Sequence, residues 1–73
     1  MDTNHLSPTV AQRVGAAIKA GGYSVKAMAE KTQIPRVTLT RRLAGAAPFN
    51  TNELDAIAGV LKCSPADFYQ DAA

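Results

Sequence analysis

The chain has 73 residues, a net charge of +2 and a single cysteine, so we expect one small domain, spanning residues 1–73, without an internal disulfide. Its hydrophobic fraction of 47% is ordinary for a globular protein, and no apolar run approaches the roughly 18 residues that a membrane span requires. The N-terminus lacks the basic and apolar regions of a secretory signal, which favours an intracellular domain with no membrane partner.

Charge is distributed unevenly along the chain. Residues 10–45 hold seven basic residues and one acidic residue, a net +6, whereas residues 46–73 hold one basic and four acidic residues, a net −3. Asp2 contributes the remaining negative charge. A basic half joined to an acidic half suggests a face that binds a polyanion, although solvated basic helices are also common.

The first two predicted helices are delimited by their caps. After a flexible segment over residues 1–6, Ser7-Pro8 reads as an N-cap followed by proline at the first helical position, and Gly21-Gly22 ends this helix. Its apolar stripe consists of Val10, Val14, Ala17 and Ile18. Ser24 caps the second helix, which ends near Thr32-Gln33. Its inward residues are Val25, Met28 and Ala29.

The third helix is predicted from Pro35 to about Ala44, and Gly45 terminates it. On a helical wheel of roughly 100° per residue, Leu39 and Leu43 fall together and face the core. The remaining surface carries only short or guanidinium-tipped side chains: Arg36, Val37, Thr38, Thr40, Arg41 and Arg42. Such a surface contains no large apolar group that would bind a protein partner or insert into lipid.

Two further helices follow the loop after Gly45. Asn50 and Glu53 form a plausible capping box for the fourth helix, whose apolar stripe is Leu54, Ile57, Ala58 and Leu61. Ser64-Pro65 repeats the cap-plus-proline signal and begins a short fifth helix that carries Phe68 and Tyr69. One of these two aromatics is needed to close the small core, for which we expect Phe68. Without any strand-like alternation, the sequence predicts a compact all-α domain.

The surface of the third helix suits the major groove of B-DNA, which is about 12 Å wide and admits one helix. Arginine can donate two parallel hydrogen bonds to guanine, and the methyl groups of valine and threonine can contact the methyl group of thymine. A proline followed by arginine at its start also suits a helix that enters the groove by its positive N-terminal end.

Two stretches of the chain resemble the Cro/C1-type (XRE) helix-turn-helix domain of phage and bacterial repressors. They are "SVKAMAEKTQIPRVTLTRRLAG" at residues 24–45 and "NELDAIAGVLKCSPADFY" at residues 52–69. The resemblance extends over residues 14–69 and implies a five-helix, lambda-repressor-like fold in which helices two and three form the helix-turn-helix. The matching positions are Ala29 at the close approach of these helices, Ile34 in the turn, Leu39 in the core of the recognition helix and Gly45 at its end. The family often has glycine at the position of Gln33, where the backbone is left-handed, and an apolar residue at that of Arg42.

The resemblance also implies a role for each candidate site residue. Base contacts would come from the outward residues of the recognition helix, Arg36, Val37, Thr40 and Arg41. Phosphate contacts would come from Ser24, Lys26, Thr38, Asn50 and Thr51. Arg42 would either reach a phosphate or lay its stem along the core and send its head to solvent. Because family members often pair through the last helix, a dimer surface is expected at Phe68 and Tyr69.

These residues predict a sequence-specific regulator that binds double-stranded DNA, most simply a Cro-like phage repressor that binds operator DNA. We expect it to act in the cytoplasm of a bacterial host, at the nucleoid. We also expect it to pair as a homodimer, at least on DNA. Met1 and the short ending "QDAA" favour a free-standing protein over the isolated DNA-binding domain of a larger repressor. A protein-interaction module of the antitoxin type is the alternative from another class. No acid, thiol or second histidine lies near His5 in sequence, and Cys63 reads as a buried apolar residue. The sequence therefore predicts no metal, cofactor, small-molecule ligand or catalysis.

Overall fold

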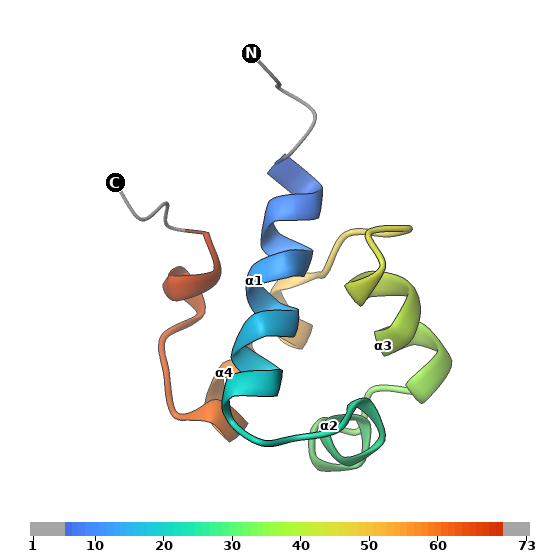
Figure 1. Cartoon of the computed structure of the whole chain (residues 1–73), viewed down its shortest axis with the longest axis vertical. Helices are drawn as coiled ribbons and strands as arrows, with labels where there is room; N and C mark the ends of the chain where they lie inside the picture. Colours follow the sequence, from blue (N-terminus) through green and yellow to red (C-terminus); the bar gives the residue numbers. More distant parts are fainter. Residues whose placement is uncertain (1–5, 70–73) are drawn as a thin grey trace.

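The computed structural model describes the backbone of residues 6–69 and the side chains of residues 10–69. Four α-helices and one 3-10 helix occur in this part of the chain (Figure 1). They are α1 (Leu6–Ala20), α2 (Val25–Thr32), α3 (Arg36–Leu43), α4 (Thr51–Leu61) and η1 (Pro65–Phe68). Residues 6–69 contain no strand, so the all-α prediction is confirmed. His5 and nearly all of the segment expected to be flexible lie outside the described residues.

The first helix begins earlier than predicted. α1 starts at Leu6, so Ser7 lies inside the helix and is not its N-cap. Pro8 is tolerated there because the first N–H groups of a helix have no intrahelical partner. The end of α1 agrees with the prediction, since Ala20 is its last residue and the glycine pair follows.

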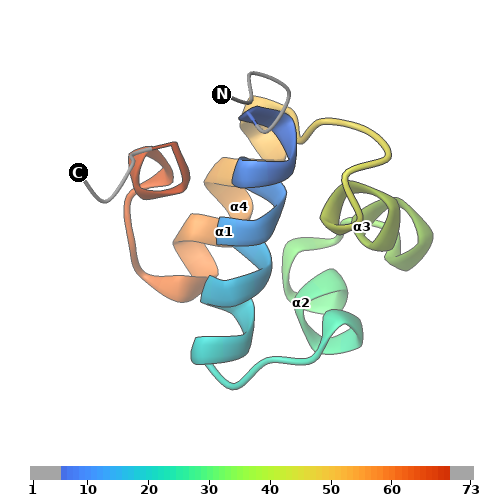
Figure 2. The same ribbon diagram turned by 45° about the horizontal axis from the view of Figure 1, so that its top comes forward.

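The core lies where the helices converge. α3 packs against α1 and α2, α2 also packs against α4, and η1 packs against α1 and α4. In both ribbon views α1 lies between α3 on one side and η1 on the other (Figures 1 and 2). The fully buried large side chains are Val14, Met28, Leu39, Leu54, Ile57 and Phe68. Every one of them lies on a predicted apolar stripe or was expected to close the core. Ala11, which is also buried, was not predicted.

The connection between α2 and α3 is short and begins with a left-handed residue. Gln33 has φ 62° and ψ 25°, as the resemblance implied for this position. A side chain in this conformation costs roughly 1–2 kcal/mol relative to a right-handed backbone. Ile34 is buried in the turn, and Pro35 is the N-cap of α3. The buried Ile34 therefore fixes the start of α3 to the core.

α3 is one residue shorter at each end than predicted, with Ala44 as its C-cap. Gly45 follows with φ 83°, a left-handed conformation that glycine adopts without steric cost. Its N–H donates to the carbonyl of Arg42 at 3.1 Å, and the Ala46 N–H donates to that of Arg41 at 3.0 Å. This pair of bonds is a Schellman motif, which satisfies the last carbonyls of α3.

The N-terminus of α4 carries the predicted capping box. The Asn50 side chain accepts a hydrogen bond from the Glu53 N–H at 2.8 Å, and the Glu53 carboxylate accepts one from the Asn50 N–H at 2.9 Å. These reciprocal bonds satisfy two of the donors that the helix itself leaves unpaired.

The predicted fifth α-helix is a 3-10 helix. The N–H groups of Asp67 and Tyr69 donate to carbonyls three residues earlier, those of Ser64 and Ala66. The segment is capped by Ser64 and has only four residues, a length at which 3-10 bonding is common. Phe68 is 2% exposed and belongs to the core, so the prediction that it forms part of a dimer surface is wrong. Burial of this ring closes the core between α1 and α4, and only Tyr69, at 58% exposure, remains on the surface.

Candidate nucleic-acid interface

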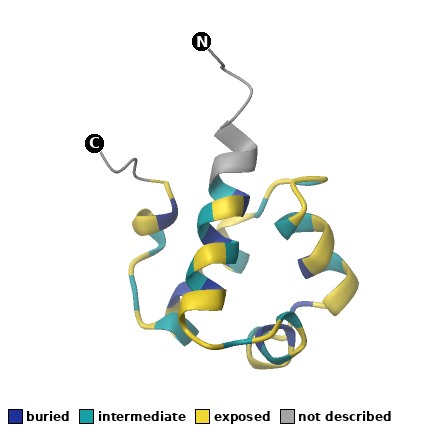
Figure 3. Cartoon of the chain, viewed as in Figure 1, coloured by how far each residue is buried: buried dark blue, intermediate teal, exposed yellow. Residues whose placement is uncertain are grey.

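One face of α3 is exposed from end to end. Arg36, Val37, Thr40 and Arg41 are all exposed, while Leu39 on the opposite side is fully buried. At roughly 100° per residue, the four exposed side chains fall within an arc of about 140°. Figure 3 shows the outer side of α3 as exposed and the side toward α1 as buried. The four residues predicted to read bases thus share one accessible face.

Two other polar residues of α3 lie outside this face, since Thr38 and Arg42 are about 60° and 100° beyond Arg41 on the same wheel. Thr38 and Arg42 are half-buried, and they are one helical turn apart. The side chain of Leu43, also half-buried, packs against the core next to α1, where its Cδ2 atom lies close to Gly15. The side chains of Thr38, Arg42 and Leu43 therefore lie partly in solvent and partly against the rest of the protein.

The N-terminus of α2 presents polar groups to solvent. Ser24 and Lys26 are exposed, and the Ser24 hydroxyl accepts a hydrogen bond from the Ala27 N–H at 3.0 Å. The ring of Tyr23 packs against the core, with the Lys31 ammonium 6.0 Å from its centroid. The Ser24 side chain is thus held at the helix end, where the dipole of α2 is positive.

The N-terminus of α4 contributes two more predicted phosphate contacts. Asn50 and Thr51 are both exposed. The Oδ1 atom of Asn50 is used in the capping box, which leaves its amide NH₂ group as a donor on the surface. This helix end is connected to α3 through the side chain of Glu53.

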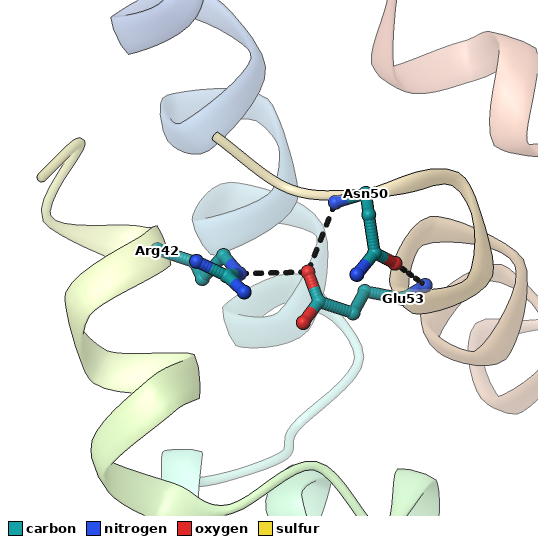
Figure 4. Close-up of polar contacts among 3 residues, drawn as sticks. All are labelled: Arg42, Asn50 and Glu53. Atoms are coloured by element: carbon teal, nitrogen blue, oxygen red, sulfur yellow. Dashed lines mark hydrogen bonds and ion pairs between the residues drawn. The ribbon is translucent and has the colours of Figure 1, made fainter. Parts of the chain in front are cut away.

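Arg42 forms an ion pair with Glu53 across the two helices. Its Nε lies 2.8 Å from the Glu53 Oε1, which also accepts the Asn50 N–H (Figure 4). The Arg42 side chain is 24% exposed and that of Glu53 is 12% exposed. Arg42 therefore points from α3 toward the start of α4, and a phosphate contact by this residue remains a prediction.

The surroundings of Glu53 change its acidity. Burial raises the pKa of this carboxyl, but the hydrogen bond and the charge of Arg42, together with the Asn50 N–H, outweigh burial and lower the pKa below its ordinary value of 4.5. Glu53 is therefore ionised at neutral pH, and the ion pair is charge-assisted.

Sequence reasoning assigned Glu53 only to the cap of α4 and missed its contact with Arg42. No local pattern reveals this contact, because the two residues are 11 positions apart and lie on different helices. The unusual arginine at a position where the family often has an apolar residue was the only signal of a special environment.

A model of the Cro/C1-type helix-turn-helix DNA-binding domain matches residues 16–72. This match covers α2, the turn and α3 together with α4 and η1. The chain belongs to this family. Comparisons with curated proteins and with solved structures find no match.

As a Cro/C1-type helix-turn-helix domain, the chain binds DNA. The family is typically non-enzymatic. Within residues 6–69, none of the helices has both the length and the apolar character needed to cross a membrane. The described residues also include no group of three or more histidine, cysteine, aspartate or glutamate side chains placed to hold a metal ion. Cys63 is a free cysteine, half-buried against the core, where full burial was expected.

Proposed function

We propose that this domain is a sequence-specific, Cro-like repressor that reads operator DNA with the exposed face of α3. Arg36, Val37, Thr40 and Arg41 contact base edges in the major groove. The accessibility of all four on a single helix face, opposite the buried Leu39, is the observation that carries the proposal. The two arginines supply bidentate donors for guanine, and Val37 and Thr40 supply methyl groups for thymine.

Phosphate contacts fix the register of the domain on the duplex. They come from Ser24 and Lys26 at the start of α2, from Thr38 on α3, and from Asn50 and Thr51 at the start of α4. Contacts of this kind carry no sequence information themselves, but they orient the recognition helix so that its side chains reach the bases.

Two copies of the domain bind one operator. A single module of this size buries roughly 600–1,000 Å² on DNA and needs a second copy for tight binding. Two recognition helices about 34 Å apart then read half-sites one turn apart, and occupation of an operator that overlaps a promoter represses transcription. Tyr69, exposed beyond η1, is the candidate contact between copies. Such a repressor works in the cytoplasm of its bacterial host, on the nucleoid.

Selection of bound sequences from a random duplex library, at about 150 mM salt, tests the proposal, because this ionic strength suppresses non-specific binding. Recovery of an inverted repeat with half-sites one turn apart would support a dimeric operator binder. A single asymmetric site would keep sequence-specific binding and remove the dimer. Failure to enrich any sequence would contradict sequence-specific reading by α3 and would direct attention to a protein partner.

Arg41→Ala and Arg41→Lys then separate base reading from charge. We expect Arg41→Ala to weaken binding to the selected operator by about 1–3 kcal/mol and to relax the preference at one base pair. Arg41→Lys keeps the charge but lacks the planar fork, so it should lose the same preference and retain the salt dependence. Both are measured by titration of the operator and of its single-base variants. An Arg41→Lys variant with unchanged base preference would contradict the assignment.

A further inference from the structure

We infer that Arg42 is a positioning residue for DNA recognition and acts through Glu53, not through a phosphate. This inference rests on the proposed function of the α3 face. The Arg42–Glu53 pair joins the end of the recognition helix to the N-terminal cap of α4, and this connection sets how α3 is presented to the duplex.

The need for such a connection follows from the size of α3. The helix has eight residues, a length at which an isolated helix is unstable in water, so its orientation depends on tertiary contacts. Leu39 is its only fully buried side chain. Its N-cap, Pro35, makes no side-chain capping hydrogen bond. Leu43, half-buried, packs against the core only about 40° from Leu39 on the wheel, so the apolar anchors of α3 lie on one side of the helix and restrain its rotation about its own axis weakly.

The ion pair supplies a second restraint at a different angle on the helix. Arg42 and Leu39 are about 60° apart on the wheel, three residues along the axis. Arg42 Nε donates to Glu53 Oε1 at 2.8 Å, and the 12% exposure of the Glu53 side chain protects this bond from water. A restraint of this kind holds Arg41, the neighbouring residue on the exposed face, in a constant direction.

The same carboxylate oxygen also belongs to the cap of α4. Glu53 Oε1 accepts both the Arg42 Nε–H and the Asn50 N–H (Figure 4). Asn50 and Thr51 are proposed phosphate contacts, so a single side chain connects a segment that sets register with the helix that reads bases. Loss of the ion pair therefore disturbs the relative placement of two parts of the DNA-binding surface.

The test uses Arg42→Gln, Glu53→Gln and the double variant in the full chain. Each is titrated with the selected operator and with random duplex at 10 °C, over a range of salt concentrations, and its thermal midpoint is recorded. Glutamine at position 53 keeps an oxygen for the Asn50 N–H but removes the charge that faces Arg42.

Positioning predicts a specific pattern. Both single variants lower the ratio of operator affinity to random-duplex affinity by roughly 3- to 10-fold, and the double variant is no worse than either single variant, because the two residues act as one unit. The salt slope of Arg42→Gln stays within about half a unit of the wild-type slope, since no phosphate contact is lost. Lys62→Gln is the matched control: it removes an exposed positive charge between α4 and η1, leaves the ratio unchanged and shows no coupling to Glu53→Gln.

A phosphate contact by Arg42 predicts different results and would overturn the inference. Arg42→Gln would then lower the salt slope by about 0.9 and weaken binding to both duplexes alike. Glu53→Gln would strengthen binding to both, since it removes a negative charge near DNA.

Two further outcomes are distinguishable. Lower thermal midpoints with an unchanged affinity ratio at 10 °C would reduce the pair to a stabilising contact and overturn the inference alone. Absence of any operator preference in the wild-type chain would contradict the proposed function and the inference together. If Arg42→Gln does not fold at 10 °C, Arg42→Lys replaces it, because lysine retains the charge and lacks the Nε donor. The ratio of operator affinity to random-duplex affinity should then fall by a smaller factor.

Discussion

Two non-glycine residues within residues 6–69 adopt the left-handed backbone conformation. Gln33 has φ 62° at the end of α2, and Lys62 has φ 59° at the end of α4. The position of Gln33 was expected from the family resemblance, whereas that of Lys62 was not, because Lys62 is not one of the residue types that mark such turns. At the residue scale, a left-handed residue therefore ends α2 and α4, and the residue type at these positions does not by itself predict this conformation.

Glu53 makes the stability of the domain depend on pH. Its pKa is lowered in the folded state, so the carboxylate contributes stability above its ordinary pKa of 4.5, and this contribution disappears as pH falls through the lowered value. We expect the free energy of unfolding of the wild type to exceed that of Glu53→Gln at pH 7. Below about pH 4.5 the difference should narrow and finally vanish.

Urea unfolding of both proteins between pH 7 and pH 2, followed by far-ultraviolet circular dichroism, measures this difference. The glutamine variant is the matched control, because every other acidic residue is protonated in the same way in both proteins as the pH falls. A difference that stays constant over the whole range would show that the charge of Glu53 does not stabilise the fold.

At the scale of the elements, side-chain caps explain where α2, α4 and η1 begin. Side chains of Ser24, Asn50 and Ser64 accept hydrogen bonds from N–H groups two or three residues later. Each cap was visible in the sequence because it involves residues within one turn of each other. α3 differs from these three, because proline is its N-cap and it has no side-chain cap. α3 therefore depends more than α2 and α4 on tertiary contacts.

α4 contains a glycine that its packing does not require. Apart from its chain neighbours and the backbone of its own helical turns, a Cβ atom added at Gly59 would meet nothing within 4 Å, and the residue is exposed. We expect Gly59→Ala to raise the free energy of unfolding by about 0.5–1 kcal/mol, because alanine loses less backbone entropy in a helix. Thermal unfolding should show a midpoint several degrees above that of the wild type.

Gly21→Ala is the contrasting variant. A Cβ atom there would lie 2.9 Å from Leu61 Cδ2 and 3.2 Å from Tyr23 Cδ2, so the side chains around the end of α1 must move. We expect a lower thermal midpoint for this variant. A Gly59→Ala midpoint at or below that of the wild type would mean that α4 does not gain from helix propensity at this position.

At the scale of the whole molecule, basic and acidic side chains gather on different helices. α2 and α3 carry four exposed basic residues, Lys26, Lys31, Arg36 and Arg41, and one exposed acidic residue, Glu30, whereas α4 and η1 carry the exposed Asp55 and Asp67. α1 lies between α3 and η1 in both ribbon views (Figures 1 and 2). A polyanion would therefore approach the side formed by α2 and α3.

Two lysines test this polarity. Lys26 stands in the first turn of α2, and Lys62 lies in the connection between α4 and η1; both are exposed. We expect Lys26→Ala to weaken binding to all duplexes alike and to lower the salt slope by about one unit, because one phosphate contact is lost. Lys62→Ala should leave the slope unchanged. Titrations of both variants with DNA over a range of salt concentrations measure these slopes. Equal slopes for the two variants would mean that Lys26 does not contact a phosphate.

Much of the domain follows from sequence alone. The α-helices, most of their caps, the left-handed Gln33 and the outward face of α3 were all predictable. These features depend on signals within three or four residues, on the apolar period of 3.6 or on a family pattern with many matching positions. The end of α3 at Gly45 is of this kind, since a glycine after the last helical residue is a local signal.

Only the tertiary structure decided the features that join distant parts of the chain. The sequence indicated Phe68 as the aromatic residue that closes the core, but the 3-10 geometry of its segment and the packing of that segment against α1 and α4 did not follow from the sequence. The partner of Arg42 depends on where the start of α4 lies relative to the end of α3. A helical wheel gives the direction of a side chain but not what it meets there. Contacts between elements are set by packing, because they require both elements to be in place at once.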